Sequence, residues 1–286
     1  MSIVLGAATQ QNLLALQNVN SQLVTTQNAL ATGLKVSSAV DDAVKFFESQ
    51  SLSNRATDLT TRKDSIDQGV SSVTAATVGI QSSITILQQM QGILQSAKTE
   101  TASQRKSAAA QFNTLAGQLN ALLNDTTYQG LNLINSTSST LTLQFSQSTS
   151  STLKVHGQNL LISKSISGGN LGSVIASKLA GTTFSTAVSK GHTSAFDIAY
   201  KALSNTISTF QAAAATLGAN VSFLQTRLAF TSQYIATLQG GSSKLTVADV
   251  NQESTNLVTL QTRQQLAIQS LSIATQSEQA VLRLFH

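Results

Sequence analysis

The chain of 286 residues is long enough for one or two domains, and its composition excludes several classes of function. It contains no cysteine, which excludes disulfides, thiolate metal sites and cysteine nucleophiles. Charged residues make up only 10% of the chain and aromatic residues 5%, and the net charge is +5. The basic residues are scattered without interleaved aromatics, so nucleic-acid binding is not predicted. A surface with so few charges is typical of a protein that is extensively buried against partners.

The N-terminal segment predicts an amphipathic helix without charges. Residues 2–34 contain no charged side chain, and one face keeps a spacing of three and four residues. The apolar positions of this face are Leu13, Leu16, Leu23, Leu30 and Leu34, and Asn20 and Gln27 continue the spacing. Gln10 and Gln11 interrupt the first apolar residues, so the segment lacks the apolar region of a cleaved signal peptide. Because such a helix is marginal alone in water, we expect it to need a partner.

A much longer helix is predicted between Glu48 and Ala97. Apolar residues occupy every seventh position, at Leu52, Leu59, Ile66, Val73, Ile80, Leu87 and Leu94. At about 1.5 Å per residue this helix would extend about 70 Å, which predicts a rod. Gly69, Gly79 and Gly92 lie outside the apolar seam. No stretch approaches 18 consecutive apolar residues, so no membrane-spanning helix is expected.

The segments on either side of a second helix carry turn and cap signals. Asp41 and Asp42 precede the long helix, where they predict an N-terminal cap or a bend. The second helix is predicted from the spacing of Ala108, Phe112, Leu115, Leu119 and Leu122. The sequence Asn-Asp-Thr-Thr-Tyr-Gln-Gly at 124–130 follows it and predicts a turn that reverses the chain.

The middle of the chain, residues 136–194, is rich in serine and threonine and predicts a small β-containing insert. Polar and apolar residues alternate over three short runs, which predict strands. The runs contain Leu141, Leu143 and Phe145, then Leu153 and Val155, then Leu160 and Ile162. A turn is expected at Ser167–Asn170.

The seam of the rod returns after the insert. It runs from Phe196 to Leu238 through Tyr200, Leu203, Phe210, Leu217, Leu224 and Thr231, with only Thr231 polar. Gly-Gly-Ser-Ser at 240–243 predicts the end of this helix and a joint. A last helix resembles the first in pattern, with an apolar face at Leu257, Leu260, Leu271, Val281 and Phe285, and with Gln264 at the same spacing.

These patterns predict a mainly α fold. Helices with long apolar seams can bury them only against one another, so we expect an elongated antiparallel helical bundle, or rod. The small β-containing insert and the two terminal helices, each of which needs a partner helix or a neighbouring subunit, complete it. The predicted parts are a terminal helix at 1–45, the N-terminal half of the rod at 46–135, the insert at 136–194, a C-terminal rod helix at 195–240 and a second terminal helix at 241–286.

No constellation of residues predicts chemistry. The three histidines, His156, His192 and His286, have no second metal ligand at helical spacing. Ser151 and Lys154 have a spacing found in some acyl enzymes, but in a serine-rich tract this is expected by chance. No phosphate-binding or dinucleotide-binding glycine motif occurs. We therefore expect no catalytic, cofactor-binding or metal-binding residues and no enzyme activity.

Both ends of the chain resemble bacterial flagellins. Residues 256–274, NLVTLQTRQQLAIQSLSIA, closely resemble the terminal segment of that family, and VLRLF at 281–285 looks like its ending. Residues 12–20, NLLALQNVN, and 30–42, LATGLKVSSAVDD, are similar to its opening helix and the turn that follows. The resemblance covers about 130 residues at the front and about 90 at the back.

The resemblance implies a secreted structural subunit that polymerises with itself into the extracellular bacterial flagellar filament for swimming motility. It implies an elongated rod with paired terminal coiled-coil helices, which line the filament core. It also implies export through the flagellar type III apparatus, guided by about residues 27–47, and an export chaperone that binds the C-terminal helix at about 256–285. The same resemblance implies contacts with the filament cap and hook-associated proteins. It implies no cofactor, no nucleic-acid binding and no membrane insertion.

Three alternatives stay open. A hook-filament junction protein shares the terminal plan, and the run from Leu260 to Ala274 favours a flagellin over it. An enzyme could be grafted into the middle, but the insert is short and lacks His-Glu-x-x-His. A coiled-coil adhesin or signalling rod is the third alternative.

Overall fold

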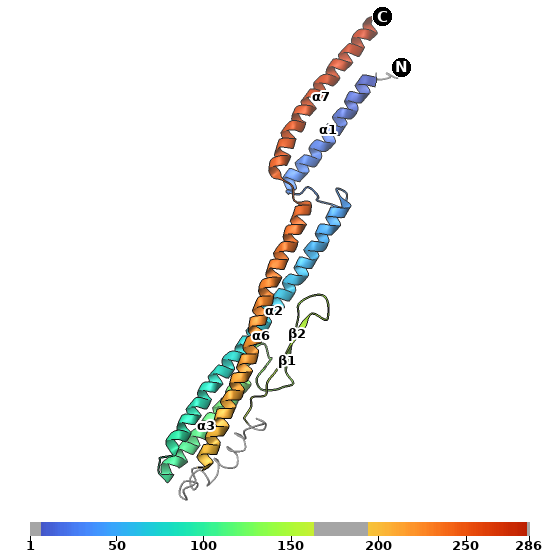
Figure 1. Ribbon diagram of the computed structural model, residues 1–286. Helices are drawn as coiled ribbons and strands as arrows, with labels where there is room; N and C mark the ends of the chain where they lie inside the picture. The colour runs from blue at the N-terminus through green and yellow to red at the C-terminus, as the bar shows by residue number, and fades with distance from the viewer. Residues whose placement is uncertain (1–6, 163–193, 285–286) are drawn as a thin grey trace. The chain divides into compact units, whose positions relative to one another are not determined.

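The computed structural model describes residues 7–162 and 194–284, which contain five helices and two strands (Figure 1). The elements are α1 (Ala7–Thr32), α2 (Ala43–Ala97), α3 (Ala102–Asp125), β1 (Thr140–Gln144), β2 (Thr152–His156), α6 (Ser194–Thr246) and α7 (Val250–Leu284). They form two compact units, residues 58–233 and residues 1–57 with 234–286, and α2 and α6 contribute to both. The predicted mainly α fold with a small β part is confirmed.

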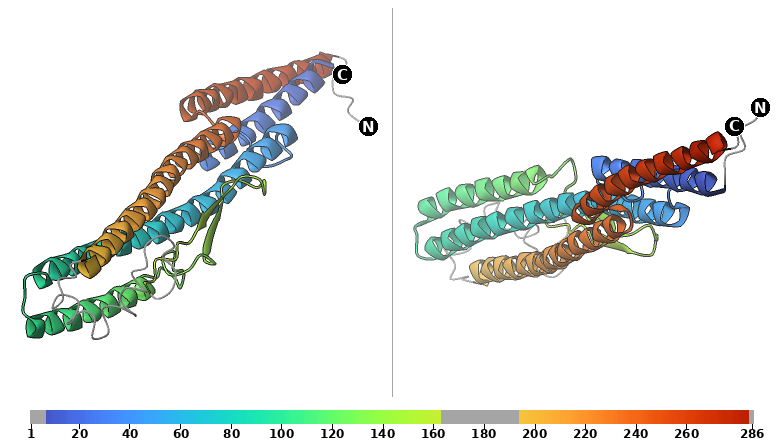
Figure 2. Two further views of the ribbon diagram at one scale, coloured as in Figure 1. Left: turned by 60° about the horizontal axis from the view of Figure 1, so that its bottom comes forward. Right: turned by 90° about the horizontal axis from the view of Figure 1, so that it is seen from above.

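In the unit of residues 58–233, α2, α3 and α6 form a helical bundle with one hydrophobic core. Both α3 and α6 run antiparallel to α2 (Figures 1 and 2). The seven-residue seam of α2 faces this core, and Ile66, Val73, Ile80 and Leu87 are fully buried. Further seam residues are buried in the same core, namely Leu94 on α2 and Leu203, Phe210, Leu217 and Leu224 on α6, and Leu59 is buried outside it. Leu52 belongs to the other unit and is half-buried.

The buried stripe departs from the predicted seam at single positions. On α3 the core residue is Leu123, which is fully buried, whereas the expected Leu122 is only partly covered. On α6 Ala199 is fully buried and the expected Tyr200 is 41% exposed. The physical reason is that a straight helix of 3.6 residues per turn drifts by about 20° per heptad, so the buried position shifts to a neighbour.

Polar residues also lie in this core. Thr231 was expected as a gap in the apolar seam, and it is buried, with its hydroxyl donating to the carbonyl of Arg227 at 2.8 Å. Thr206 is fully buried and bonds in the same way to the carbonyl of Ala202 at 2.8 Å. Because the helix backbone satisfies these hydroxyls, burial leaves no unpaired polar group at either position.

Strands β1 and β2 form an antiparallel hairpin in which Leu141 pairs with Val155 and Leu143 with Leu153. The third predicted strand is wrong. Leu160 and Ile162 are buried at 2% and 3% exposure, but they lie in irregular chain, and only the isolated bridge between Asn135 and Asn159 pairs this segment. The alternation of apolar and polar residues there reflects the burial of every second side chain, and no described strand lies beside this segment to extend the β1–β2 sheet. The turn expected at 167–170 lies outside the described residues.

The turn expected after α3 is present. The backbone groups of Tyr128 and Leu131 bond reciprocally at 2.9 and 3.0 Å around Gln129 and Gly130, which both have positive φ. This is the geometry of a two-residue reverse turn that favours glycine. The hydroxyl of Tyr128 donates to Oε1 of Gln68 on α2 at 2.6 Å and holds the turn against the bundle.

Two glycines of α2 are contact points and not merely weak positions outside the seam. At Gly69 a Cβ atom would collide with the side chain of Leu143 from the hairpin, and at Gly79 it would meet the side chains of Thr126 and Ile134. Gly92 has open space around it. The segment after α3 therefore packs directly on the backbone of α2 where side chains are absent.

Replacing Gly69 by valine is expected to displace the hairpin. The added side chain overlaps Leu143, and overpacking of this kind destabilises a fold by about 1–3 kcal/mol. Gly92→Val is the matched control on the same helix, and it should be neutral or slightly stabilising because valine forms helix better than glycine. Urea unfolding followed by circular dichroism measures both, and equal midpoints for the two variants would contradict the contact.

The predicted end of the rod helix at residues 240–243 is wrong, because α6 continues to Thr246. Each interior glycine costs about 1 kcal/mol relative to alanine. Hydrogen bonds within the unit offset part of this cost: the hydroxyls of Ser242 and Ser49 lie 2.8 Å apart, and the hydroxyl of Ser242 also lies 3.2 Å from the carbonyl oxygen of Ser49. The linker between α6 and α7 therefore consists of residues 247–249 and lies after the predicted boundary between residues 240 and 241.

Within the described residues, helix α2 contains an 18-residue stretch that is long and apolar enough to cross a membrane. Serine, threonine and glutamine interrupt this stretch, so it is not the run of 18 consecutive apolar residues whose absence was expected. Length and composition are weak evidence for a span, since a buried core helix passes the same test. In α2 the apolar residues Ile80, Leu87 and Met90 are fully buried in the bundle.

Candidate self-assembly surface on the terminal helices

Helices α1 and α7 lie side by side and antiparallel (Figure 1). The pair buries mostly small residues, among them Thr26 and Ala29 on α1, together with Leu260 on α7 at 8% exposure. The predicted assembly leucines are less covered: Leu16, Leu23, Leu30, Leu34, Leu257 and Leu271 are half-buried, and Leu13 is 38% exposed. The side chain of Val281 and all of Phe285 lie outside the described part of the chain.

The polar positions in the two terminal seams meet each other. The side-chain amide of Gln264 on α7 donates to Oδ1 of Asn20 on α1 at 2.7 Å. Both residues occupy the seam spacing, where an apolar residue would pack better. A polar pair in a helix seam favours one register, because a shift of one helix along the other exchanges this bond for bonds to water. The pair therefore favours the observed alignment of α1 and α7.

Asn20→Ala is expected to weaken the terminal pair. Loss of one exposed hydrogen bond between side chains corresponds to about 0.5–1.5 kcal/mol, which should raise the critical concentration for polymerisation by about two- to tenfold. Asn18→Ala is the matched control, since Asn18 is exposed on the same helix. Sedimentation of filaments from soluble subunits gives the critical concentration, and equal values for both variants would contradict a role for the pair.

The outer faces of both helices expose large apolar side chains. Leu14 and Val24 on α1 are 59% and 54% exposed. On α7 the exposed residues are Val258, Leu266, Ile268 and Ile273, each 53–63% exposed. Residues 2–34 carry no charge, so α1 has no charged side chain that would favour exposure of the helix to water. Exposed apolar side chains that gather on a surface mark interaction sites, and they occur on both helices of this pair.

Two linkers pair with each other between the helices of this unit. Gly33 ends α1 with a φ of 69°, a left-handed conformation that favours glycine. The chain then bonds to the α6–α7 linker, through Lys35 N to Thr246 O at 2.7 Å and Ala248 N to Gly33 O at 2.9 Å. An isolated antiparallel bridge joins Leu34 to Val247. The two connections are thus held together as one joint.

Three aspartates organise the joint. Asp42 caps α2, as predicted, by accepting from the backbone N–H of Lys45 at 3.0 Å, and Asp249 caps α7 by accepting from that of Asn251 at 2.9 Å. Asp41 accepts from the hydroxyl and backbone of Ser37 at 2.9 Å, and these bonds lower the pKa of its carboxyl below 3.8. The side-chain bond to Lys45 lowers the pKa of Asp42 in the same direction. Both carboxylates stay ionised at neutral pH, and their bonds are lost only as the pH falls through the lowered values.

An open groove of about 740 Å³ lies between α1, the joint and α7. Its charged lining consists of Lys35, Asp41, Glu253 and Arg263, and the remaining lining is mainly serine, threonine, asparagine and glutamine. The cap at Asp249 and the helix end at Gly33 were not predicted from the sequence. Their signals were present: an aspartate directly before a helix and a glycine directly after one.

The arrangement defines a class of protein. Among residues 7–162 and 194–284 no group of three or more potential metal ligands occurs, and the described histidine, His156, is exposed on β2. The prominent features are a helical bundle and a pair of terminal helices with uncovered apolar faces. They are typical of a structural subunit that assembles with copies of itself.

Comparison with known proteins identifies the family. Residues 5–139 match the bacterial flagellin N-terminal helical region, and residues 200–285 match the bacterial flagellin C-terminal helical region. The chain belongs to the bacterial flagellin family. It is a structural subunit of the bacterial flagellar filament, and it is related to proteins that form the extracellular flagellum.

Relatives align over nearly the whole chain. Flagellin FljK of Caulobacter vibrioides is 28% identical over 96% of this chain and 95% of its own length. Flagellin of Brucella melitensis is 26% identical over 99% of each chain. A putative flagellar hook-associated protein from Vibrio parahaemolyticus shares the fold with a TM-score of 0.63 at 14% identity, covering 72% of this chain and 100% of that protein.

Proposed function

We propose that the α1–α7 pair is the polymerising part of the subunit and that its folding is completed by neighbouring subunits in the filament. The observation that carries this proposal is the uncovered apolar surface on both helices, from Leu14 and Val24 to Ile268 and Ile273. Burying a large apolar side chain stabilises by about 1.5–3 kcal/mol, so covering several of them gives a driving force for assembly. Assembly then orders the helices and buries their faces in one step.

The same surface must be protected before assembly. We infer that an export chaperone binds α7, at about residues 256–285, and prevents premature polymerisation. Secretion through the flagellar type III apparatus, and contacts with the filament cap and hook-associated proteins at the filament ends, belong to this proposal. The segment of about residues 27–47 that would guide export runs from the last residues of α1 through the linker to the first residues of α2. A non-enzymatic role follows from the family, which is one of structural proteins.

A junction role is the alternative within the same organelle. The likeness to a hook-associated protein concerns the fold alone, at 14% identity, and does not favour that role. Copy number separates the two functions, because a filament subunit is present throughout the filament and a junction protein only at its base.

Hydrogen exchange of monomer and filament tests the proposal. We expect peptides from α1 and α7 to exchange rapidly in the monomer and at least about 100-fold more slowly in the filament, because local stability rises when the faces are covered. Peptides around Ile80 and Leu87 are the internal control and should be protected in both states, since these residues are fully buried in the bundle. Equal protection of α1 and α7 in the two states would exclude coupled folding.

A further inference from the structure

An arginine of α6 lies at the centre of an aromatic cluster beside the β-hairpin. The guanidinium carbon of Arg227 is 4.9 Å from the ring centroid of Phe145 and 5.4 Å from that of Phe230. Phe223, one helical turn before Arg227, meets Phe145 edge-on at 5.9 Å between centroids. Phe145 is buried, but Phe223 and Phe230 are 49% and 55% exposed. We call Phe223, Arg227 and Phe230 the aromatic-arginine face.

Arg227 has unused hydrogen-bonding capacity. Its Nη2 donates one long bond, 3.4 Å, to the hydroxyl of Ser151, and its buried Nε has no acceptor. No carboxylate of the described residues forms an ion pair with it. A guanidinium presents five N–H donors in a planar fork that suits a carboxylate, and aromatic rings around it exclude water. The face is therefore suited to an anionic partner.

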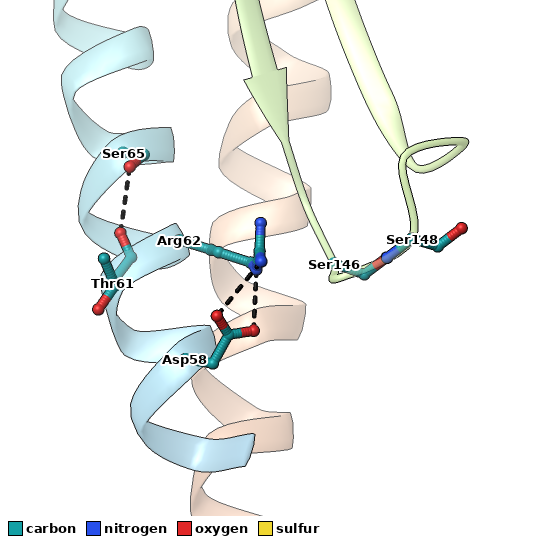
Figure 3. A network of polar contacts seen from close by, with 6 residues as sticks. All are labelled: Asp58, Thr61, Arg62, Ser65, Ser146 and Ser148. Atoms are coloured by element: carbon teal, nitrogen blue, oxygen red, sulfur yellow. Dashed lines mark hydrogen bonds and ion pairs between the residues drawn. The ribbon is translucent and has the colours of Figure 1, made fainter. Parts of the chain in front are cut away.

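Acidic groups without a partner lie on another helix of the same unit. Asp58 binds Arg62 through two bonds of 3.0 and 3.2 Å (Figure 3). Asp197 binds Lys98 at 2.7 Å. By contrast Asp64 and Asp67 on α2 are exposed, and the described residues offer them no ion pair. We call Asp64 and Asp67 the acidic pair.

The acidic pair points away from the hairpin. Arg62 extends from α2 toward the hairpin tip at Ser146 (Figure 3), and Gly69 lies against Leu143 of the hairpin. At about 100° per residue, Asp64 and Asp67 are rotated from Arg62 by roughly 140–200° around α2. The aromatic-arginine face contacts the hairpin through Phe145. The two complementary patches therefore lie on different sides of one molecule.

We propose that the aromatic-arginine face of one subunit binds the acidic pair of a neighbouring subunit in the filament. This inference rests on the proposed function as a polymerising subunit and adds a contact in the unit of residues 58–233. Two different patches that bind each other form a heterologous contact, which repeats into an open helical assembly instead of closing as a dimer. Phe223 and Phe230 shield the ion pair from water, as aromatic residues do around charged contacts at interfaces.

Cross-linking tests the contact directly because the chain has no cysteine of its own. The double variant Arg227→Cys, Asp67→Cys is grown on wild-type filament seeds and treated with a short bis-maleimide, because two cysteines in place of an arginine and an aspartate that form an ion pair lie too far apart for a direct disulfide. We expect a ladder of cross-linked multimers on a denaturing gel, and at most dimers from either single variant. Filaments of the double variant that yield only monomers after this treatment would overturn the proposal.

Charge reversal tests the energetics. Two sets of charge reversals should each raise the critical concentration about tenfold: Arg227→Glu alone, and Asp64→Lys together with Asp67→Lys. The triple variant, which combines them, should return to within about threefold of the wild type. Lys201→Glu is the control, because it makes the same charge change on α6 at an exposed site outside the face. If the triple variant polymerises no better than the worse parent, while monomer melting temperatures are unchanged, the contact does not exist. Charge-reversal results that contradict this contact would not change the hydrogen exchange expected for the terminal helices. The contact and the proposed function can therefore be disproved independently.

Discussion

Removal of α7 is expected to abolish filament growth. A chain ending at Asp249 keeps α6 complete and loses every exposed apolar residue of α7, including Val258, Leu266, Ile268 and Ile273. If these four side chains are buried in the filament at about 1.5–3 kcal/mol each, their loss raises the critical concentration by more than about a thousandfold. Electron microscopy after seeding should then show no elongation.

The folding of the truncated chain can be measured independently of its assembly. Its bundle of α2, α3 and α6 has a separate core within residues 58–233, so its main thermal transition should stay within a few degrees of that of the full chain. Ile268→Ser provides a milder version that keeps α7 and should raise the critical concentration by about tenfold or more. Normal elongation of the truncated chain would show that the terminal pair does not drive assembly.

Ile80→Ala is expected to destabilise the bundle by about 2–5 kcal/mol. Ile80 is fully buried in the hydrophobic core, where truncation removes apolar contact and leaves a cavity that close-packed neighbours fill only in part. The loss should appear as a lower denaturant midpoint with an unchanged slope, because the surface exposed on unfolding is nearly the same.

Val78→Ala on the same helix is the matched control. Val78 is 60% exposed, so its truncation should change the free energy of unfolding by less than about 0.5 kcal/mol. A similar loss at both positions would mean that α2 does not turn its seven-residue seam toward the core. It would also remove the basis for placing the seam of α6, with Phe210, opposite to it.

Much of the fold could be predicted because helical periodicity is a local property. Ile66, Val73 and Leu87 share one face of α2 whatever surrounds the helix, and a face of that length can be buried only against other helices. The cap at Asp42 and the turn at Gly130 were also predictable, since each depends on the chemistry of a few adjacent residues. The near absence of charge at both termini indicated surfaces that need a partner.

The rest depended on segments that are distant in the sequence. Periodicity could not choose Ala199 over Tyr200, because a one-residue shift depends on what packs opposite. It could not show that α6 continues through Gly241, where the contact between Ser49 and Ser242, 193 positions apart, offsets part of the glycine penalty. Nor could it distinguish a strand at Leu160 from buried irregular chain.

For the candidate self-assembly surface, too, some features follow from the sequence and others only from the tertiary structure. The sequence by itself determined which residues of α1 and α7 are apolar and that polar Asn20 and Gln264 interrupt the two faces. Only the tertiary structure decided that these two residues, 244 positions apart, bind each other. It also decided that Thr26 and Ala29 are buried while Leu14 and Ile268 stay uncovered. The reason is that side-chain pattern follows from the local helical turn, whereas alignment and exposure follow from where the partner helix lies.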